Sequence, residues 1–185
     1  TLAGALCGAA LPFLFSGILI DAVAIAARKM VEEVRRQFRE IPGILEGTAK
    51  PDYKTCIEIS SQGSLQAMRF PALMAIVIPV ATGFIFGPDF VGGLLIGGTI
   101  TAIMLAIFTG NAGGAWDNAK KYIETAALGK DHAKGSNTHA AAVVGDTVGD
   151  PLKDTVGPCL DIFIKIMSTV SRVCVPLFIR FNLFT

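Results

Sequence analysis

Residues 70–104 read FPALMAIVIPVATGFIFGPDFVGGLLIGGTITAIM, and Asp89 is their only charged residue. A helix that crosses the hydrocarbon core of a bilayer needs about 20 largely apolar residues, so this run is long enough for nearly two crossings. Gly87 and Pro88 stand near its middle, and both residues are typical of turns. The run therefore predicts two membrane-spanning helices that meet at residues 87–88.

Two further apolar stretches lie at the ends of the sequence. Residues 1–27 contain one charged residue, Asp21, and residues 162–185 contain three, which are Lys165, Arg172 and Arg180. We predict an all-α fold, a polytopic membrane helix bundle in which four transmembrane helices have long cytoplasmic extensions. The predicted spans are residues 3–28, 69–87, 91–115 and 142–180.

The basic residues predict the orientation of these spans. Eight of the 16 Lys and Arg residues lie in residues 28–69 and four more in residues 120–134, whereas the turn at residues 87–90 has none. Because positively charged loops stay on the cytoplasmic side, we expect both basic loops in the cytoplasm and both termini outside.

The composition fits a membrane protein and argues against other classes. The chain has 185 residues, of which 52% are hydrophobic and only 17% charged, whereas about a quarter of a soluble domain is charged. A net charge of +1 without a basic stripe argues against a nucleic-acid binder. The four cysteines form no CxxC motif, which favours reduced, packed thiols. The chain does not begin with Met and has no secretory signal, so we expect a fragment of a longer protein.

The segment after the first span is rich in charge. Residues 28–40 read RKMVEEVRRQFRE, with apolar residues at helical spacing and glutamates one turn from arginines. We expect the first helix to continue into the cytoplasm as far as Pro42 and Gly43. This charged segment is either a solvated, ion-paired helix end or a group of basic residues that lies near an anionic ligand. Residues 43–64 are predicted to form a loop with a short helical piece and no chemistry of its own.

Two motifs mix carboxylates with lysines. In GNAGGAWDNAKKYIE, residues 110–124, Gly113 and Gly114 permit close helix packing, Trp116 is interpreted as a membrane-interface anchor, and Asp117 lies one helical turn from two lysines. In GDTVGDPLKDTVGP, residues 145–158, three aspartates at i, i+4 and i+8 fall near one helical face.

Three carboxylates on one face would repel one another, so we expect cations beside them. Mg²⁺ binds carboxylates and phosphate oxygens, and nearby lysines attract anions. The motifs therefore predict a phosphate–Mg²⁺ site at the cytoplasmic face, although plain ion-paired or solvated helix ends remain alternatives. The i, i+4 spacing of Asp161 and Lys165 predicts an ion-handling pair inside the membrane, because Lys165 lies about 22 Å deeper than Asp150 by helical rise. A structural ion pair is the alternative. Together these features suggest a primary pump.

At GGAWDNAKKYIE and GDTVGDPLKDTVGP the sequence closely resembles the membrane-bound, ion-pumping inorganic pyrophosphatases, and EEVRRQF, IPGILEGTAKPDY and LDIFIKIM support the match. The resemblance covers essentially the whole chain. Since the family has sixteen membrane helices, it implies that residues 1–185 are the C-terminal part of one membrane domain. It also implies pyrophosphate hydrolysis that moves H⁺ or Na⁺ out of the cytoplasm, by a homodimer in the bilayer, as in a prokaryotic inner membrane.

The resemblance also implies roles for individual residues. Mg²⁺ would be the cofactor, held by Asp117 and Asp150, with K⁺ and Na⁺ as further ions. Lys120 and Lys153 match lysines that hold pyrophosphate, and Lys121 is placed with them in the substrate site.

The catalytic and gating residues follow in the same way. Asp154 matches an aspartate that positions the attacking water, and Asp146 a further acidic residue of that site. Asp161 and Lys165 match the ion gate, and Asp at position 161 resembles the Na⁺-pumping, K⁺-dependent branch, with an H⁺ pump as the alternative. Two other hypotheses remain: a cation transporter without hydrolysis, which would not need the lysines, and a structural fragment that is inactive alone.

Overall fold

The computed structural model describes residues 1–183, and every regular element in that range is helical. The long helices are α1 (Leu2–Glu40), α2 (Tyr53–Phe86) and α3 (Pro88–Glu124). A short 3₁₀ helix, η1 (Lys130–His132), precedes α4 (Asn137–Asp150). The π-helical segment η2 (Pro151–Val156) then joins α4 to α5 (Gly157–Arg180).

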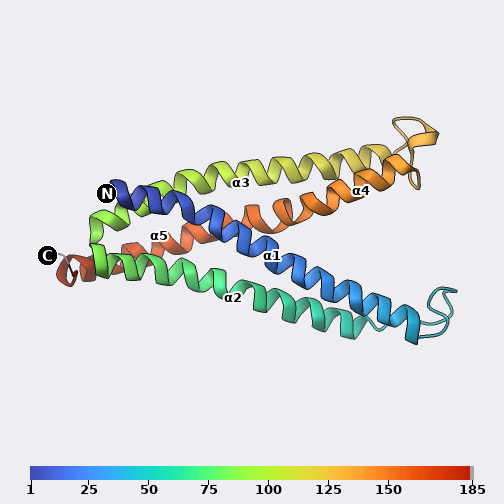
Figure 1. Cartoon of the computed structure of the whole chain (residues 1–185), viewed down its shortest axis with the longest axis horizontal. Helices are drawn as coiled ribbons and strands as arrows, with labels where there is room; N and C mark the ends of the chain where they lie inside the picture. Colours follow the sequence, from blue (N-terminus) through green and yellow to red (C-terminus); the bar gives the residue numbers. More distant parts are fainter. Residues whose placement is uncertain (184–185) are drawn as a thin grey trace.

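Four helical units are long and apolar enough to cross a membrane: α1, α2, α3 and the continuous unit formed by α4, η2 and α5. This confirms the predicted fold of four membrane-length helices. Both connecting loops lie at one end of the bundle, and both termini lie at the other end with the turn between α2 and α3 (Figure 1). The charge-based prediction requires this arrangement, because it places both basic loops on one side of the bilayer.

The boundaries of the second helix correct the sequence analysis. Helix α2 begins at Tyr53, so residues 53–64, predicted to belong to a loop with only a short helical piece, form its first three turns. Asp52 starts the helix, because its side chain accepts a hydrogen bond from the backbone N–H of Thr55 at 3.1 Å. The side chain of Gln37 also accepts a hydrogen bond from the backbone N–H of Asp52, which ties the start of α2 to the end of α1.

Backbone-to-backbone contact joins α1 to α3. A Cβ atom at Gly4 or Gly8 would collide with carbonyl groups of α3, and one at Gly93 or Gly97 would collide with carbonyl groups at the start of α1. Small residues of this kind let membrane helices approach closely and gain dispersion contact, since lipid offers no hydrophobic driving force between helices. The seam therefore fixes how α1 crosses α3.

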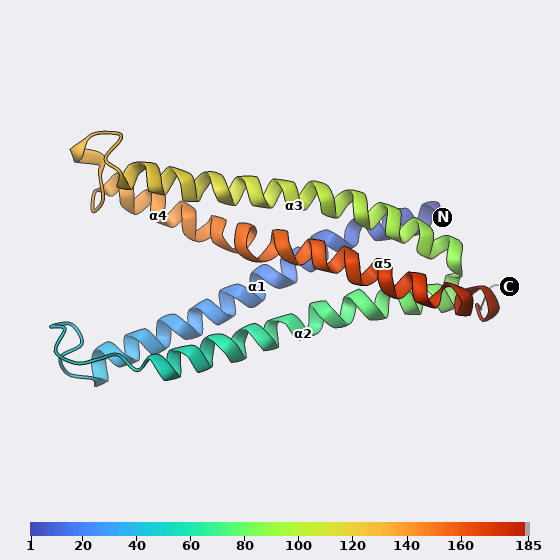
Figure 2. The ribbon, with the colours of Figure 1, turned by 180° about the vertical axis from the view of Figure 1, so that it is seen from behind.

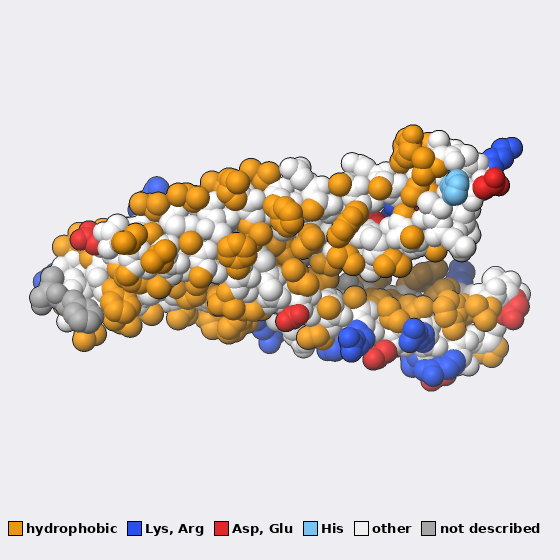
Figure 3. Space-filling view, turned by 45° about the horizontal axis from the view of Figure 1, so that its top comes forward, with side chains coloured by type: hydrophobic (Ala, Val, Ile, Leu, Met, Phe, Trp, Pro, Cys, Tyr) orange, Lys and Arg blue, Asp and Glu red, His pale blue; other side chains and the backbone are white. Residues whose placement is uncertain are grey.

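The core lies where α1, α3 and α5 meet, near the middle of the bundle. Phe15 of α1 and Phe163 of α5 are buried there, with ring centroids 4.4 Å apart. Toward the loop end, the pair α1–α2 diverges from the pair α3–α4 (Figure 2). The space-filling view shows a recess between the two arms at that end, where the charged side chains also gather (Figure 3).

Candidate functional site

Glycine packing brings the two predicted motifs together. A Cβ at Gly113 of α3 would lie 2.5 Å from the carbonyl oxygen of Gly149 and 2.7 Å from Cβ of Lys153. A Cβ at Gly149 would in turn lie 2.9 Å from the ring of Trp116. The role predicted for Gly113 is confirmed, whereas Gly114 makes no close helix contact within residues 1–183, because a Cβ at that position would meet no neighbouring helix within 4 Å. Trp116 packs on α4, a contact that the interpretation as a membrane anchor missed.

Asp117 is the centre of the ion-pair network that this packing creates. Its Oδ2 atom accepts hydrogen bonds from Nζ of Lys121 and Nζ of Lys153, both at 2.8 Å. Nζ of Lys120 lies 4.0 Å from its Oδ1 atom and donates a hydrogen bond to Oδ2 of Asp146. Three lysines and two aspartates from α3, α4 and η2 thus form one connected set.

These contacts determine the charge state of the site. The hydrogen bonds from Lys121 and Lys153 lower the pKa of Asp117 to about 2, because they favour the ionised carboxylate. The hydrogen bond to Asp146 raises the pKa of Lys120 for the corresponding reason. Around neutral pH, Asp117 is therefore an anion and Lys120 a cation, so the site can offer oxygen ligands to a metal ion and ammonium groups to an anion.

Asp146 is the most enclosed carboxylate of the set. Its exposed fraction is 4%, and although Oδ2 is paired with Lys120, the Oδ1 atom is buried without a hydrogen-bond partner among residues 1–183. An unpaired buried oxygen is costly, so such an atom indicates a missing donor or cation. This single oxygen is the structural sign that a further group belongs at the site.

The other two aspartates of the second motif are not enclosed. Asp154 is exposed, with Oδ1 3.7 Å from Nζ of Lys153, and Asp150 is exposed without an ion pair to any residue in the described range. Within residues 1–183, no group of three or more His, Cys, Asp and Glu side chains is arranged to hold a metal ion. The three aspartates of this motif therefore do not converge on one point within this chain, and the cations expected beside them stay a prediction. The charge of Lys120 neutralises that of Asp146. The π-helical segment changes the helical register after Asp150, so Asp154 no longer lies on the same helical face.

The donor set still fits Mg²⁺. Mg²⁺ keeps several waters and is usually bound by one or two carboxylates together with phosphate oxygens of the substrate. Asp117, Asp150 and the unpaired oxygen of Asp146 supply hard oxygen donors of this kind, although they do not form a complete cage.

An open cavity of about 410 Å³ lies beside the site, between α3 and the segment formed by η2 and the start of α5. Lys153 lies in its wall, together with Gly110 and Gly157, and Asp161 also lies in this wall. Asp161 and Lys165 form no ion pair with each other or with another of residues 1–183, so the alternative of a structural ion pair is not found, and the ion-handling role of the two residues stays a prediction. Asp161 is therefore left facing the cavity while Lys165 stays apart.

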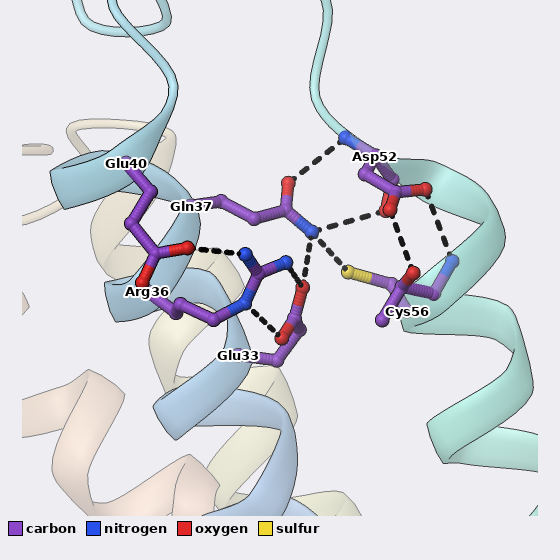
Figure 4. Close-up of polar contacts among 7 residues, drawn as sticks. Glu33, Arg36, Gln37, Glu40, Asp52 and Cys56 are labelled. Atoms are coloured by element: carbon purple, nitrogen blue, oxygen red, sulfur yellow. Dashed lines mark hydrogen bonds and ion pairs between the residues drawn. The ribbon is translucent and has the colours of Figure 1, made fainter.

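Sequence reasoning missed a second polar network, at the junction of α1 and α2 (Figure 4). The guanidinium of Arg36 donates to both oxygens of Glu33, at 2.9 and 2.7 Å, and to Glu40 at 2.6 Å. Nε2 of Gln37 donates to Glu33 at 2.8 Å and to the carbonyl oxygen of Asp52 at 3.0 Å. The ion-paired helix end was expected, but not its attachment to α2. The Pro-Asp pair before Tyr53, a typical helix-start signal, could have indicated it.

A third contact was also not foreseen. His139 of α4 lies 3.0 Å from Glu124, the last residue of α3, through its Nε2 atom. Its Nδ1 atom accepts a hydrogen bond from the backbone N–H of Gly135, which assigns Nε2 as the donor of the hydrogen bond to the carboxylate. This contact closes the base of the loop between α3 and α4, and no local sequence pattern indicates it because 15 residues separate the two side chains.

Comparison with known proteins settles the family. The sequence model of the family described as inorganic H⁺ pyrophosphatase matches residues 1–174. The chain belongs to this family. All the predicted site residues of this pyrophosphatase family member lie inside the matched range, and the resemblance drawn from its two acidic motifs is confirmed.

The relatives are ion pumps of more than one kind. The chain is 61% identical, over 99% of its length, to the K⁺-stimulated pyrophosphate-energized sodium pump of Thermotoga maritima, of which it covers 25%. It is 53% identical, over 96% of its length, to the K⁺-insensitive pyrophosphate-energized proton pump of Methanosarcina mazei, of which it covers 26%. It is 47% identical, over 95% of its length, to the pyrophosphate-energized membrane proton pump 3 of Arabidopsis thaliana, of which it covers 23%. The chain therefore spans about a quarter of the length of the relatives that it matches.

Proposed function

We propose that residues 1–185 are the C-terminal part of a single-domain membrane pump that hydrolyses pyrophosphate and moves Na⁺ out of the cytoplasm. The observation that carries this proposal is the set of three lysines interleaved with Asp117 and Asp146, placed at the loop end of a four-span bundle. The rest of the proposal follows from family membership: Mg²⁺ as cofactor, K⁺ as activator, a homodimer, and a prokaryotic inner membrane as the location.

Substrate binding follows from the ion pairs. Lys120, Lys121 and Lys153 are each held by a carboxylate, so a phosphate group that enters can take their hydrogen bonds in exchange. The released oxygens of Asp117, with Asp150, are then free to serve as metal ligands. These carboxylates would hold Mg²⁺, which would supply positive charge against the charge that develops on the leaving phosphate.

The two remaining carboxylates have different proposed roles in hydrolysis. Asp154 is exposed next to Lys153, so it can accept the proton of a water that attacks phosphorus, together with a carboxylate from another part of the protein. Asp146 is buried and hydrogen-bonded to Lys120, an arrangement that suits orienting this lysine toward phosphate. Its unpaired Oδ1 atom leaves room for a further donor or cation in the assembled site.

Ion movement is assigned to the cavity. Asp161 lies eight residues after Lys153, about 12 Å deeper by helical rise, and both side chains line the same cavity. When lysines exchange carboxylate for phosphate, η2 and α5 can shift and change access to Asp161. Na⁺ as the ion is supported by the Thermotoga maritima relative, whereas the Methanosarcina mazei relative supports H⁺ as the second candidate.

The test uses the full-length protein in sealed vesicles supplied with Mg²⁺ and pyrophosphate. Phosphate release, Na⁺ uptake and internal pH are followed for the wild type, for Asp154→Asn, and for Asp131→Asn as the matched exposed control. We expect Na⁺ uptake coupled to hydrolysis, both abolished only by Asp154→Asn. Acidification without Na⁺ dependence would replace Na⁺ by H⁺, and no phosphate release from the wild type would refute the pump.

A further inference from the structure

A groove between α1 and α2 lies outside the site described above. The two helices run antiparallel, and they meet at Ala26 and Gly63, where a Cβ on Gly63 would lie 3.2 Å from Cβ of Ala26. Beside this contact is an open groove of about 290 Å³. Its wall is apolar at Ala22, Ile25 and Phe70, and polar at Lys29 and Gln66.

The groove lies at the loop-side end of the first predicted span, residues 3–28. Ala22 is about 30 Å from Leu2 along α1, which equals the thickness of the hydrocarbon core. Phe70 begins the uncharged run of α2, and Lys29 belongs to the basic segment that follows the first span. The apolar end of the groove is therefore at the depth of the acyl chains, and the polar end at the depth of the head groups on the loop side.

The two polar side chains come from opposite walls of the groove. Side chains on a helix lean toward its N-terminus, so Lys29 on α1 leans toward the membrane and Gln66 on the antiparallel α2 leans toward the loops. Neither has a hydrogen bond or an ion pair with another of residues 1–183, and Lys29 is the one charged residue among those that line the groove. An ammonium and an amide thus stand without partners above an apolar floor.

We propose that this groove binds a phospholipid with an anionic head group from the cytoplasmic leaflet. The phosphate would accept hydrogen bonds from Lys29 and Gln66, and the first part of one acyl chain would cover Ala22, Ile25 and Phe70. Basic pockets between transmembrane helices on the cytoplasmic side recognise lipid head groups in this way. The charge of Lys29 selects an anionic lipid over a neutral one, and the apolar floor selects a lipid over a soluble phosphate.

The experiment measures lipid binding to the full-length protein in neutral detergent. Native mass spectrometry gives the affinity for phosphatidylglycerol and for phosphatidylcholine with the same acyl chains. Lys29→Gln is compared with Lys50→Gln, the same change of charge in the loop between α1 and α2. We expect Lys29→Gln to weaken phosphatidylglycerol binding about fivefold, the effect of one lysine at an anionic membrane surface, and to weaken phosphatidylcholine binding less, so that the preference for the anionic lipid falls. Lys50→Gln should change neither affinity.

Two further measurements keep the proposal open to refutation. Ala67→Phe fills the groove and should reduce binding of both lipids. Lys29→Arg keeps the charge and should preserve the preference for phosphatidylglycerol, and this test remains if the Ala67→Phe variant does not fold. Equal affinities in Lys29→Gln and Lys50→Gln would overturn the proposal. So would displacement of phosphatidylglycerol by soluble glycerol phosphate, which indicates a plain phosphate site. A folded Ala67→Phe variant with unchanged lipid binding would mean that another part of the protein covers the groove.

Discussion

Gly113→Ala should separate the two motifs that build the site. A Cβ at this position would lie 2.5 Å from the carbonyl oxygen of Gly149, and relaxing that contact to about 3.5 Å moves α3 and α4 apart by about 1 Å. The hydrogen bond from Lys153 to Asp117, now 2.8 Å, would then exceed the normal range for an N–H···O bond. A displacement of this size in a catalytic site can lower the rate about 100-fold.

Gly114→Ala is the matched control, because nothing lies within 4 Å of a Cβ at that position. Both changes gain the same helix propensity, roughly 1 kcal/mol, while only Gly113→Ala bears an overpacking cost of about 1–3 kcal/mol. The assay is Mg²⁺-dependent phosphate release by the full-length protein, together with the thermal unfolding midpoint in detergent. Equal activity and equal midpoints in the two variants would refute the argument that glycine packing positions Lys153 against Asp117.

Three further outcomes are expected. Asp161→Asn removes the carboxylate from the cavity wall and should lower Na⁺ uptake per phosphate released, measured in vesicles, while hydrolysis continues; an unchanged ratio would contradict the proposed path. Gly97→Ala forces a Cβ into the start of α1 and should destabilise the protein by about 1–3 kcal/mol, seen as a lower unfolding midpoint, whereas Gly92→Ala, with open space around it, should not. Glu33 has its pKa lowered from 4.5 to about 2 by Arg36, so its ion pair stabilises the fold above pH 4.5 and is lost as the pH falls toward 2. The difference in unfolding midpoint between wild type and Glu33→Gln should therefore vanish over that range, and a difference that persists at pH 2 would exclude the ion pair as its cause.

Predictions failed where a contact between helices decided the result. Residues 53–64 look like a loop by composition, yet they are helical because Asp52 caps them and Gln37 anchors the cap from α1. Asp161 and Lys165 have the spacing of an intrahelical ion pair, yet they form none. Spacing shows that two side chains can meet, but it does not show whether neighbouring helices leave a cavity beside one of them, as they do beside Asp161.

The sequence by itself determined the four spans, the shared side of the two basic loops and the family, because hydropathy, charge and motif are properties of short segments. Only the tertiary structure decided which charges pair. Lys153 meets Asp117 across 36 residues, and Lys120 meets Asp146 across 26. Both pairs exist because Gly113 and Gly149 let α3 and α4 pack at backbone distance, and a contact between distant segments depends on the shape of both surfaces.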